Sequence, residues 1–277
     1  MAQNFGVDIS SWQRGVNYHE AVKTGKVEFA LLRAGFGKNV KTGKDNMFDE
    51  HYEGFVRENI PVGAYQYSYA KSPEDAVREA EAFLGWIAGK ELDLPCFLDM
   101  EEASVAALGK KTCTEIALSW CARVRSAGYT AGIYTNPNWL EHYLDADTIG
   151  KEYRIWCASW GTKKPEYEGL VMWQFGGQTN LLRERTVPGI GDVVDQNYFY
   201  GDLPDVTPKE SAYMYVTCTK RTPTLNRSGK KELNRWIDPG DVCAIKLVEG
   251  ALVEVIYPTP SGLRTAYLKD ITNFMTE

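Results

Sequence analysis

The feature that most constrains the fold is an alternation of short strand-like runs with longer amphipathic segments between residue 4 and about residue 200. The runs are rich in β-branched and aromatic residues, and the segments between them suit helical crossovers. Repeated β-α units build a parallel sheet, and eight strands suggest a closed barrel. The predicted strands are Phe5–Ile9, Phe29–Arg33, Pro61–Tyr67, Pro95–Asp99, Thr130–Tyr134, Arg154–Ala158, Val171–Gln174 and Asp192–Asp195.

Helix signals mark only part of this repeat. Ser72-Pro73 predicts an N-cap followed by proline in the first helical turn. Thr112 and Glu115 have the spacing of a capping box and predict the start of a second helix. The helical pattern fades after Tyr134, and residues 161–188 show strand signals but little helix. We therefore predict an α/β fold with an irregular (β/α)8-type barrel.

A second unit is predicted after the barrel. Residues 201–210 contain two prolines and scattered acids and predict a linker, which separates a domain at 1–200 from one at 211–277. Short alternating strands with Pro/Gly turns favour a small all-β barrel in the second domain. Its predicted strands are Tyr213–Thr217, Val242–Leu247, Leu252–Tyr257 and Thr265–Leu268.

Charge and composition exclude several classes of function. The net charge is −6, and the whole excess of acids lies in residues 1–200, which argues against a nucleic-acid partner. The chain has three histidines, and they lack the spacing of metal ligands, which argues against a zinc site. We therefore expect neither a metal nor a cofactor. No apolar run approaches the ~20 residues of a membrane span. Met1–Trp12 has no signal-peptide pattern, so we expect a chain made in the cytoplasm with six buried free thiols.

Four acids are predicted to meet at one mouth of the barrel. Asp99 and Glu101 end the fourth strand with an i, i+2 spacing, which puts their Cα atoms ~6.5–7 Å apart on one side. Asp8 ends the first predicted strand and Asp195 the last, and these strands are neighbours in a closed barrel. Reactive groups of such barrels lie at the strand ends. Paired carboxylates with separated pKa values suit glycoside hydrolysis, whereas an ordinary acidic patch at strand ends is the structural alternative.

Aromatic residues occur at the same level of the predicted barrel. Sugar rings have apolar C–H faces and polar rims, so aromatic rings beside carboxylates suit a saccharide groove. For any single ring, packing in the core is the alternative. The candidate substrate-binding residues are Tyr65, Tyr67, Tyr134, Trp156 and Trp173.

The motifs that hold these residues resemble glycoside hydrolase family 25, the Chalaropsis-type lysozymes or N-acetylmuramidases. The resemblance covers about residues 4–200. It implies an irregular β/α barrel that cleaves the β-1,4 bond from N-acetylmuramic acid to N-acetylglucosamine in peptidoglycan. The seven motifs, in order, are Asp8-Ile-Ser-Ser-Trp-Gln, Leu32-Arg-Ala-Gly-Phe-Gly37, Gly63-Ala-Tyr65, Leu98-Asp-Met-Glu101, Gly132-Ile-Tyr-Thr135, Trp173-Gln174 and Val194-Asp-Gln-Asn197.

The resemblance also implies roles. Glu101 would be the general acid/base, kept protonated by repulsion from neighbouring acids. Asp99 would stay ionised and either stabilise the oxocarbenium ion or orient the substrate's acetamido group. Asp8 and Asp195 would position the substrate and tune this pair. Arg33 has two open interpretations, namely a substrate contact or charge balance for the acids.

One position departs from the family pattern, and the second domain has its own resemblance. Gln66 stands where the family often has histidine, which leaves its role open. Residues 211–277 resemble a bacterial SH3 module through Thr224-Leu-Asn-Arg-Ser-Gly229 and Pro239-Gly240. This implies a wall-binding module, and an appendage without a ligand is the alternative. Its candidate ligand contacts are Tyr213, Tyr215, Trp236, Tyr257 and Tyr267.

The sequence as a whole predicts a modular peptidoglycan hydrolase that resembles a bacteriophage endolysin for a Gram-positive host. Its predicted partners are the glycan strand in the barrel and a wall ligand on the second domain. The alternatives are another barrel glycosidase such as a chitinase, a catalytically silent saccharide-binding protein, and a cysteine peptidase. The oligomeric state and the stereochemical outcome stay open at this point.

Overall fold

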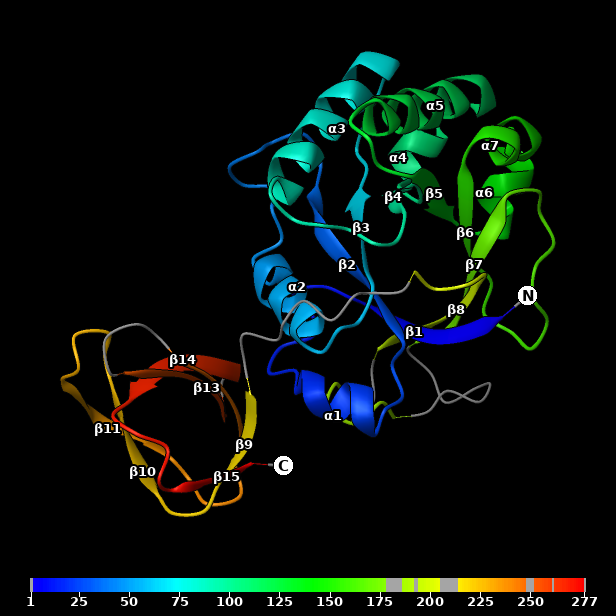
Figure 1. Ribbon diagram of the computed structural model, residues 1–277. Helices are drawn as coiled ribbons and strands as arrows, with labels where there is room; N and C mark the ends of the chain where they lie inside the picture. The colour runs from blue at the N-terminus through cyan, green and yellow to red at the C-terminus, as the bar shows by residue number, and fades with distance from the viewer. Residues whose placement is uncertain are drawn as a thin grey trace.

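The first eight strands close into a barrel in chain order (Figure 1). The structure, a computed structural model, describes residues 2–177, 186–191, 194–204, 214–247, 252–260 and 262–276. The closed barrel confirms the main architectural prediction. The strands are β1 (Gln3–Ile9), β2 (Phe29–Phe36), β3 (Val62–Tyr67), β4 (Cys96–Asp99), β5 (Ala131–Thr135), β6 (Arg154–Ala158), β7 (Leu170–Gly176) and β8 (Asp195–Tyr200).

The last strand runs against the others. β1 to β7 pair in parallel, whereas β8 is antiparallel to both β7 and β1. The prediction of an eighth strand that ends at Asp195 is therefore wrong, because β8 begins there; residues 192–193 lie outside the described residues. An antiparallel neighbour needs no long helical crossover, which accounts for the weak helix signals before it. The reversal also brings the start of β8 to the edge where the parallel strands end.

Helices cover the outside of the first strands. They are α1 (Tyr18–Lys23), α2 (Phe48–Arg57), α3 (Pro73–Ile87), α4 (Ala103–Ala106), α5 (Lys110–Ser126), α6 (Pro137–His142) and α7 (Ala146–Glu152). The N-cap at Ser72 is confirmed, since its side chain accepts a hydrogen bond from the backbone of Asp75. The capping box at Thr112 is wrong, because α5 begins two residues earlier, after Gly109, and Thr112 lies inside its first turn.

The last third of the barrel is irregular, as predicted, but it is not free of helix. The short helices α6 and α7 follow β5, although the periodic pattern fades after Tyr134. Both are too brief for hydrophobic periodicity to show in sequence. The connection from β6 to β7, residues 159–169, contains no helix and is fully described.

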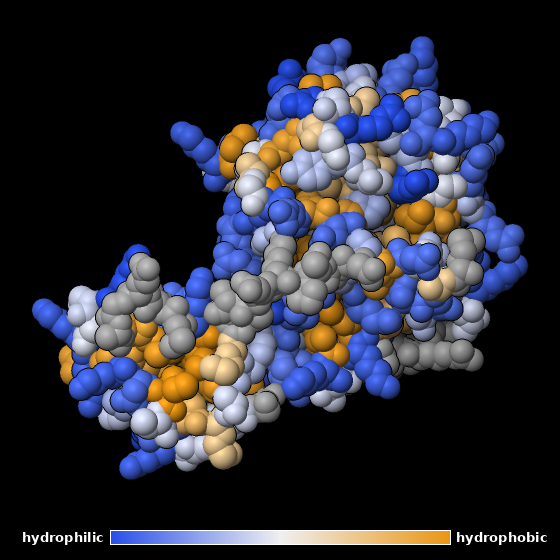
Figure 2. All heavy atoms as spheres, viewed as in Figure 1, coloured by the Kyte–Doolittle hydropathy of each residue, from blue (hydrophilic) through white to orange (hydrophobic). Residues whose placement is uncertain are grey.

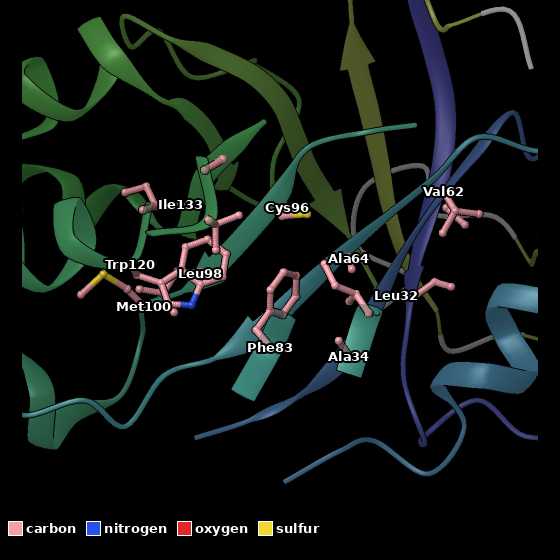
Figure 3. Close-up of a cluster of buried hydrophobic side chains, with 14 of the residues drawn as sticks. Leu32, Ala34, Val62, Ala64, Phe83, Cys96, Leu98, Met100, Trp120 and Ile133 are labelled. Atoms are coloured by element: carbon pink, nitrogen blue, oxygen red, sulfur yellow. The ribbon is translucent and has the colours of Figure 1, made fainter. Parts of the chain in front are cut away.

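Strand alternation separates an outer from an inner set of side chains. On β4, Cys96 and Leu98 face the helices, where Phe83 of α3 and Trp120 of α5 pack with ring centroids 5.2 Å apart (Figure 3). Phe97 belongs to a separate cluster with Trp156 inside the barrel. By the two-residue period of a strand, Asp99 shares the inward side with Phe97.

The second unit is a seven-stranded antiparallel sheet in the order β11-β10-β14-β13-β12-β9-β15. It has a hydrophobic core of its own. Figure 2 shows apolar residues, in orange, on the visible face of this unit. The antiparallel all-β prediction is confirmed, although β10, β11 and β15 were not predicted. The strands are β9 (Met214–Cys218), β10 (Thr222–Leu225), β11 (Lys231–Ile237), β12 (Val242–Leu247), β13 (Val253–Thr259), β14 (Gly262–Leu268) and β15 (Phe274–Thr276).

The two units touch through polar and apolar contacts, and Leu263 of β14 packs against the core of the barrel. The ring of Tyr215 stacks on that of His19 at 4.4 Å between centroids, and its hydroxyl donates to Glu58. Tyr215, predicted as a ligand contact, thus lies between the units, and Tyr257 is buried in the core of the second unit. Tyr213 and linker residues 205–210 lie outside the described residues.

The cysteines and the helices bear on two further expectations. All six cysteines are free and buried, as predicted. Within the described ranges, no helix is both long and apolar enough to cross a membrane.

Candidate active site

A pocket of about 510 Å³ opens at the barrel edge where the parallel strands end. All four predicted acids line it, together with four of the five predicted aromatic residues. The reversed strand β8 contributes through its first residue. The predicted residues that line the pocket are Asp8, Arg33, Tyr65, Tyr67, Asp99, Glu101, Tyr134, Trp156 and Asp195.

Strand pairing explains how the acids meet. Asp8 and Asp195 are direct register partners in the antiparallel pairing of β1 with β8. Asp99 ends β4 and is 5% exposed, because the inward side of this strand faces the packed barrel interior. Glu101 follows two residues later, beyond the strand, and its side chain is exposed at the pocket mouth.

Asp8 is held by two buried amides that were not predicted as site residues. Its Oδ2 accepts hydrogen bonds from Nε2 of Gln174 at 3.0 Å and Nδ2 of Asn197 at 2.7 Å. Burial nevertheless raises the pKa of Asp8 to about 6, with repulsion from Glu101 adding to the shift. The two amides favour the ionised form and work against burial.

The same amides fix aromatic rings of the pocket. Asn197 Oδ1 accepts from the indole of Trp156 at 2.8 Å, and Gln174 Oε1 accepts from Tyr134 and from Trp160, both at 3.1 Å. Both amide side chains are buried. Their position could have identified them from the sequence, because both are polar residues on buried strands and both stand inside family motifs, Trp173-Gln174 and Val194-Asp-Gln-Asn197.

Asp99 lies in an environment that opposes its ionised form. Burial raises its pKa well above the usual range, and repulsion from Glu101 and Asp8 adds to this, with Arg33 opposing. The direction of this shift works against the prediction that Asp99 stays ionised, which remains a prediction. Its Oδ1 is buried and has no hydrogen-bond partner among the described residues. A buried acceptor without a donor is costly, so this oxygen is suited to a donor from a ligand.

Glu101 and Glu102 are adjacent in sequence but are tuned in opposite directions. Desolvation of its carboxyl group by the surrounding pocket and repulsion from Glu102 raise the pKa of Glu101, although the residue keeps an exposed surface. Hydrogen bonds from Ser104 lower the pKa of Glu102, which also accepts from the hydroxyl of Tyr67 at 3.2 Å. A carboxyl group with a raised pKa beside one with a lowered pKa is the arrangement expected of a general acid.

Arg33 is paired with a residue that sequence reasoning missed. Its Nε lies 2.8 Å from Oδ2 of Asp45, and its terminal nitrogen donates to Ser11 at 3.0 Å. The Asp45 side chain is fully buried. Arg33 therefore makes its ion pair outside the four acids, although its charge partly opposes the rise in the pKa of Asp99.

Two residues singled out in the sequence lie away from the pocket. Trp173 is buried in the main core and donates through its indole to the backbone oxygen of Ser159 at 2.7 Å, so it is not a lining residue. Gln66 points to the helical layer, where it donates to two backbone oxygens and accepts from Trp120 at 2.7 Å. The position that departs from the family pattern therefore lies outside the pocket.

The pocket rim carries an aromatic residue that was not predicted. Trp12 follows β1 in the first quoted motif, lines the pocket and is 83% exposed. A large apolar ring exposed to this degree at a pocket rim is suited to contact a ligand.

Comparisons with known proteins agree with this geometry. A model of "Glycosyl hydrolases family 25" matches residues 7–182. A search of curated proteins gives no match. Solved structures are also similar in fold at low sequence identity, and three of them illustrate this.

The first is the modular autolysin LytC from Streptococcus pneumoniae, with a TM-score of 0.60, 20% identity, and coverage of 72% of this chain and 47% of that one. The chain thus spans about half the length of that relative. The bacterial lysozyme from Streptomyces coelicolor has a TM-score of 0.60 at 23% identity, covering 73% and 94%. The Clostridium perfringens spore cortex lytic enzyme SleM has a TM-score of 0.59 at 19% identity, covering 99% and 98%.

Proposed function

The chain belongs to glycosyl hydrolases family 25 and is a glycoside hydrolase, and from that premise we propose that it is an N-acetylmuramidase. It cleaves the β-1,4 bond from N-acetylmuramic acid to N-acetylglucosamine in peptidoglycan. The observation that carries this proposal is the convergence of four carboxylates and five aromatic side chains in one pocket of the barrel. Carboxylates supply the acid/base chemistry, and rings suit the faces of sugars.

Glu101 is the proposed general acid. It donates its proton to the glycosidic oxygen while the bond from this oxygen to the anomeric carbon breaks, so that the leaving sugar departs as an alcohol. The raised pKa of Glu101 supports this role, because a carboxyl group must be protonated at working pH to act as an acid.

Asp99 is the proposed partner of the substrate's acetamido group. An N–H donor at its Oδ1 would satisfy that buried oxygen and favour the ionised carboxylate. The negative charge then lies where the oxocarbenium ion develops positive charge. A substrate donor at Oδ1 would thus lower the raised pKa of Asp99.

Asp8 and Asp195 are proposed to position the substrate and to tune the reacting pair. As Asp8 ionises near pH 6, its charge favours the protonated form of Glu101, with which it interacts. The rings of Tyr134 and Trp156, 4.3 Å apart between centroids, form a wall of the sugar site. Tyr65, Tyr67 and Arg33 complete the proposed substrate contacts. Their place in the pocket supports these roles.

The whole chain is proposed to be a bacteriophage endolysin for a Gram-positive host, made in the cytoplasm and active on the cell wall. In this proposal residues 1–200 are the catalytic domain, 201–210 a linker and 211–277 an SH3-like wall-binding domain. A separate hydrophobic core in the second unit supports the division. A wall-binding unit would raise the effective concentration of the enzyme at its polymer.

Mass spectrometry of digested peptidoglycan tests the proposed bond specificity. Reducing N-acetylmuramic acid ends are expected. Reducing N-acetylglucosamine ends or freed peptides would refute the proposal, and activity on chitin but not on walls would identify a chitinase. Walls bound without any release of reducing ends would identify a silent saccharide-binding protein.

A further inference from the structure

A basic surface lies on the β10–β11 hairpin of the second unit. Residues 220–236, here called the basic hairpin, hold six of the ten Lys and Arg residues after position 200 but only one acid, Glu232. This acid is engaged elsewhere, since it pairs with Arg264 at 2.9 Å and accepts from Thr224 at 2.7 Å. The six basic residues, all exposed, are Lys220, Arg221, Arg227, Lys230, Lys231 and Arg235.

The tip of the basic hairpin is held in one shape by its own hydrogen bonds. Oδ1 of Asn226 accepts from the backbone of Ser228 and of Lys230, each at 3.0 Å. The backbone of Asn226 also donates to the carbonyl of Lys230 at 2.8 Å. Arg227 and Lys230 therefore project from an ordered turn, so little backbone entropy is lost when they bind a partner.

A bulge interrupts the pairing of β11 with β10. Pro223 pairs with Trp236 and Leu225 with Lys231, so β11 has three more residues than β10 between these two pairs. The extra residues cannot follow the regular alternation. Within this stretch Leu233 is 92% exposed, and Arg235 is exposed as well. An edge strand is thereby converted into an open surface with a row of positive charges.

Two cations converge on one exposed ring. The guanidinium of Arg221 lies 5.2 Å and the ammonium of Lys231 4.8 Å from the centroid of Trp236, which is 37% exposed. Arg221 also pairs with Asp238 at 2.9 Å. Arg227, Lys230 and Arg235 form no ion pair within the described part of the chain. Like charges gathered in this way are relieved by an anionic partner.

The position of the hairpin separates this surface from the acidic barrel. Figure 1 shows β11 on the side of the second unit that faces away from the barrel. The barrel part carries the chain's excess of acids, which would be repelled by a polyanion. Because screening limits such forces to about 8–10 Å, the basic hairpin can attract a polyanion that the barrel repels.

We propose that the basic hairpin binds an anionic wall polymer with repeating phosphodiester groups. A flexible polymer with regularly spaced charges can contact several cations of the open row at once, and the exposed side chains of Trp236 and Leu233 offer apolar contact to its polyol units. This rests on the proposed function, because it takes the wall as the place of action. It adds a binding surface that is separate from the sugar pocket.

Binding of the full chain to purified, immobilised polyol phosphate wall polymer tests the proposal. The test variant replaces Arg227, Lys230 and Arg235 with glutamine. A matched control replaces three exposed lysines of the barrel, Lys111, Lys151 and Lys163, with glutamine. The test variant is expected to bind about tenfold more weakly, since each exposed charge contact contributes modestly. Wild-type binding should weaken as salt rises from 50 to 300 mM, and the test variant should lose most of this dependence.

Several results would overturn the proposal. Unchanged binding by the test variant would do so, as would an equal loss in the control variant. Equal wild-type affinity for single-stranded RNA or for phosphatidylglycerol vesicles would show a surface that recognises charge in general or lipid instead. A second assay distinguishes the proposed enzyme function from the proposed binding by the basic hairpin. It measures release of reducing ends from peptidoglycan stripped of phosphodiester polymer, which both variants should retain. Absence of this release in the wild type would count against the proposed enzyme function rather than against the basic hairpin.

Discussion

Asp8 of β1 and Asp195 of β8 lie directly opposite each other where an antiparallel pairing closes the barrel. Two carboxylates from strands of opposite direction thus reach the pocket that Asp99 and Glu101 enter from β4. The pairing places like charges close together, which favours retention of a proton within the group. The acid that holds this proton sets the pH dependence of the site.

The hydrogen bond from Asn197 is predicted to set the acidic limb of the pH profile. Asn197→Ala removes the shorter of the two amide bonds to Asp8, so the pKa of Asp8 should rise above its value of about 6. Because catalysis is proposed to need ionised Asp8, the rising limb of kcat/KM should move to higher pH. A shift of about one pH unit corresponds to roughly 1.4 kcal/mol. The indole of Trp156 also loses its acceptor, so some loss of stability is expected.

Asn4→Ala is the matched control for this variant. Asn4 lies on β1, the strand of Asp8, where its side chain donates to the backbone of Gly201. Loss of this hydrogen bond should leave the rising limb of kcat/KM at the wild-type pH. An unmoved limb in Asn197→Ala would contradict the role given to Asp8.

Glu102 is predicted to tune Glu101 without acting itself. Glu102→Gln removes a negative charge that raises the pKa of Glu101. The general acid should then lose its proton at lower pH, so the falling limb of the profile should move to lower pH, with a modest change in maximal rate. The measurement is kcat/KM across pH 4–9. A falling limb that moves upward would exclude Glu101 as the group that titrates there.

Glu79 is predicted to make the fold less stable as pH rises. Burial raises its pKa to about 7, so between about pH 4.5 and 7 the folded state holds a proton that the unfolded state releases. Glu79→Gln should flatten the decline in the free energy of unfolding across this window, by about 2–4 kcal/mol at most. Urea unfolding at pH 5 and pH 7 measures it. An equal decline in both proteins would show that Glu79 is not the source.

Trp12 is predicted to contact substrate at the pocket rim. Trp12→Ala should raise KM for glycan strands up to about tenfold, the effect expected from loss of one aromatic contact. The melting temperature should stay unchanged because the side chain is 83% exposed. Trp236→Ala, in the second unit, is the control on short glycan fragments. Equal KM values in all three proteins would remove Trp12 from the site.

The barrel and its acidic mouth could be predicted because their signals are local. An apolar strand that ends in carboxylates shows itself in a few residues, and strand order follows from chain order in a β/α repeat. The direction of β8 could not be predicted, since it depends on pairing with β1 across most of the sequence. The helix start at Lys110 was missed because a capping-box pattern also occurs inside a helix.

Long-range side-chain pairing explains the other differences. The amides of Gln174 and Asn197 meet Asp8 only when the barrel closes, at sequence separations of 166 and 189. Trp173 and Tyr134 have similar sequence contexts, yet one packs in the core and the other lines the pocket. The rise in the pKa of Asp99 depends on burial depth, which spacing along the chain does not fix.

Replacement of Glu101 by glutamine tests the central claim most directly. Reducing ends released from purified peptidoglycan and wall binding are measured together for Glu101→Gln. The account predicts a fall in kcat of about 10²–10⁴-fold, the usual contribution of a general acid, with wall binding unchanged. Release of reducing ends at close to the wild-type rate would contradict it.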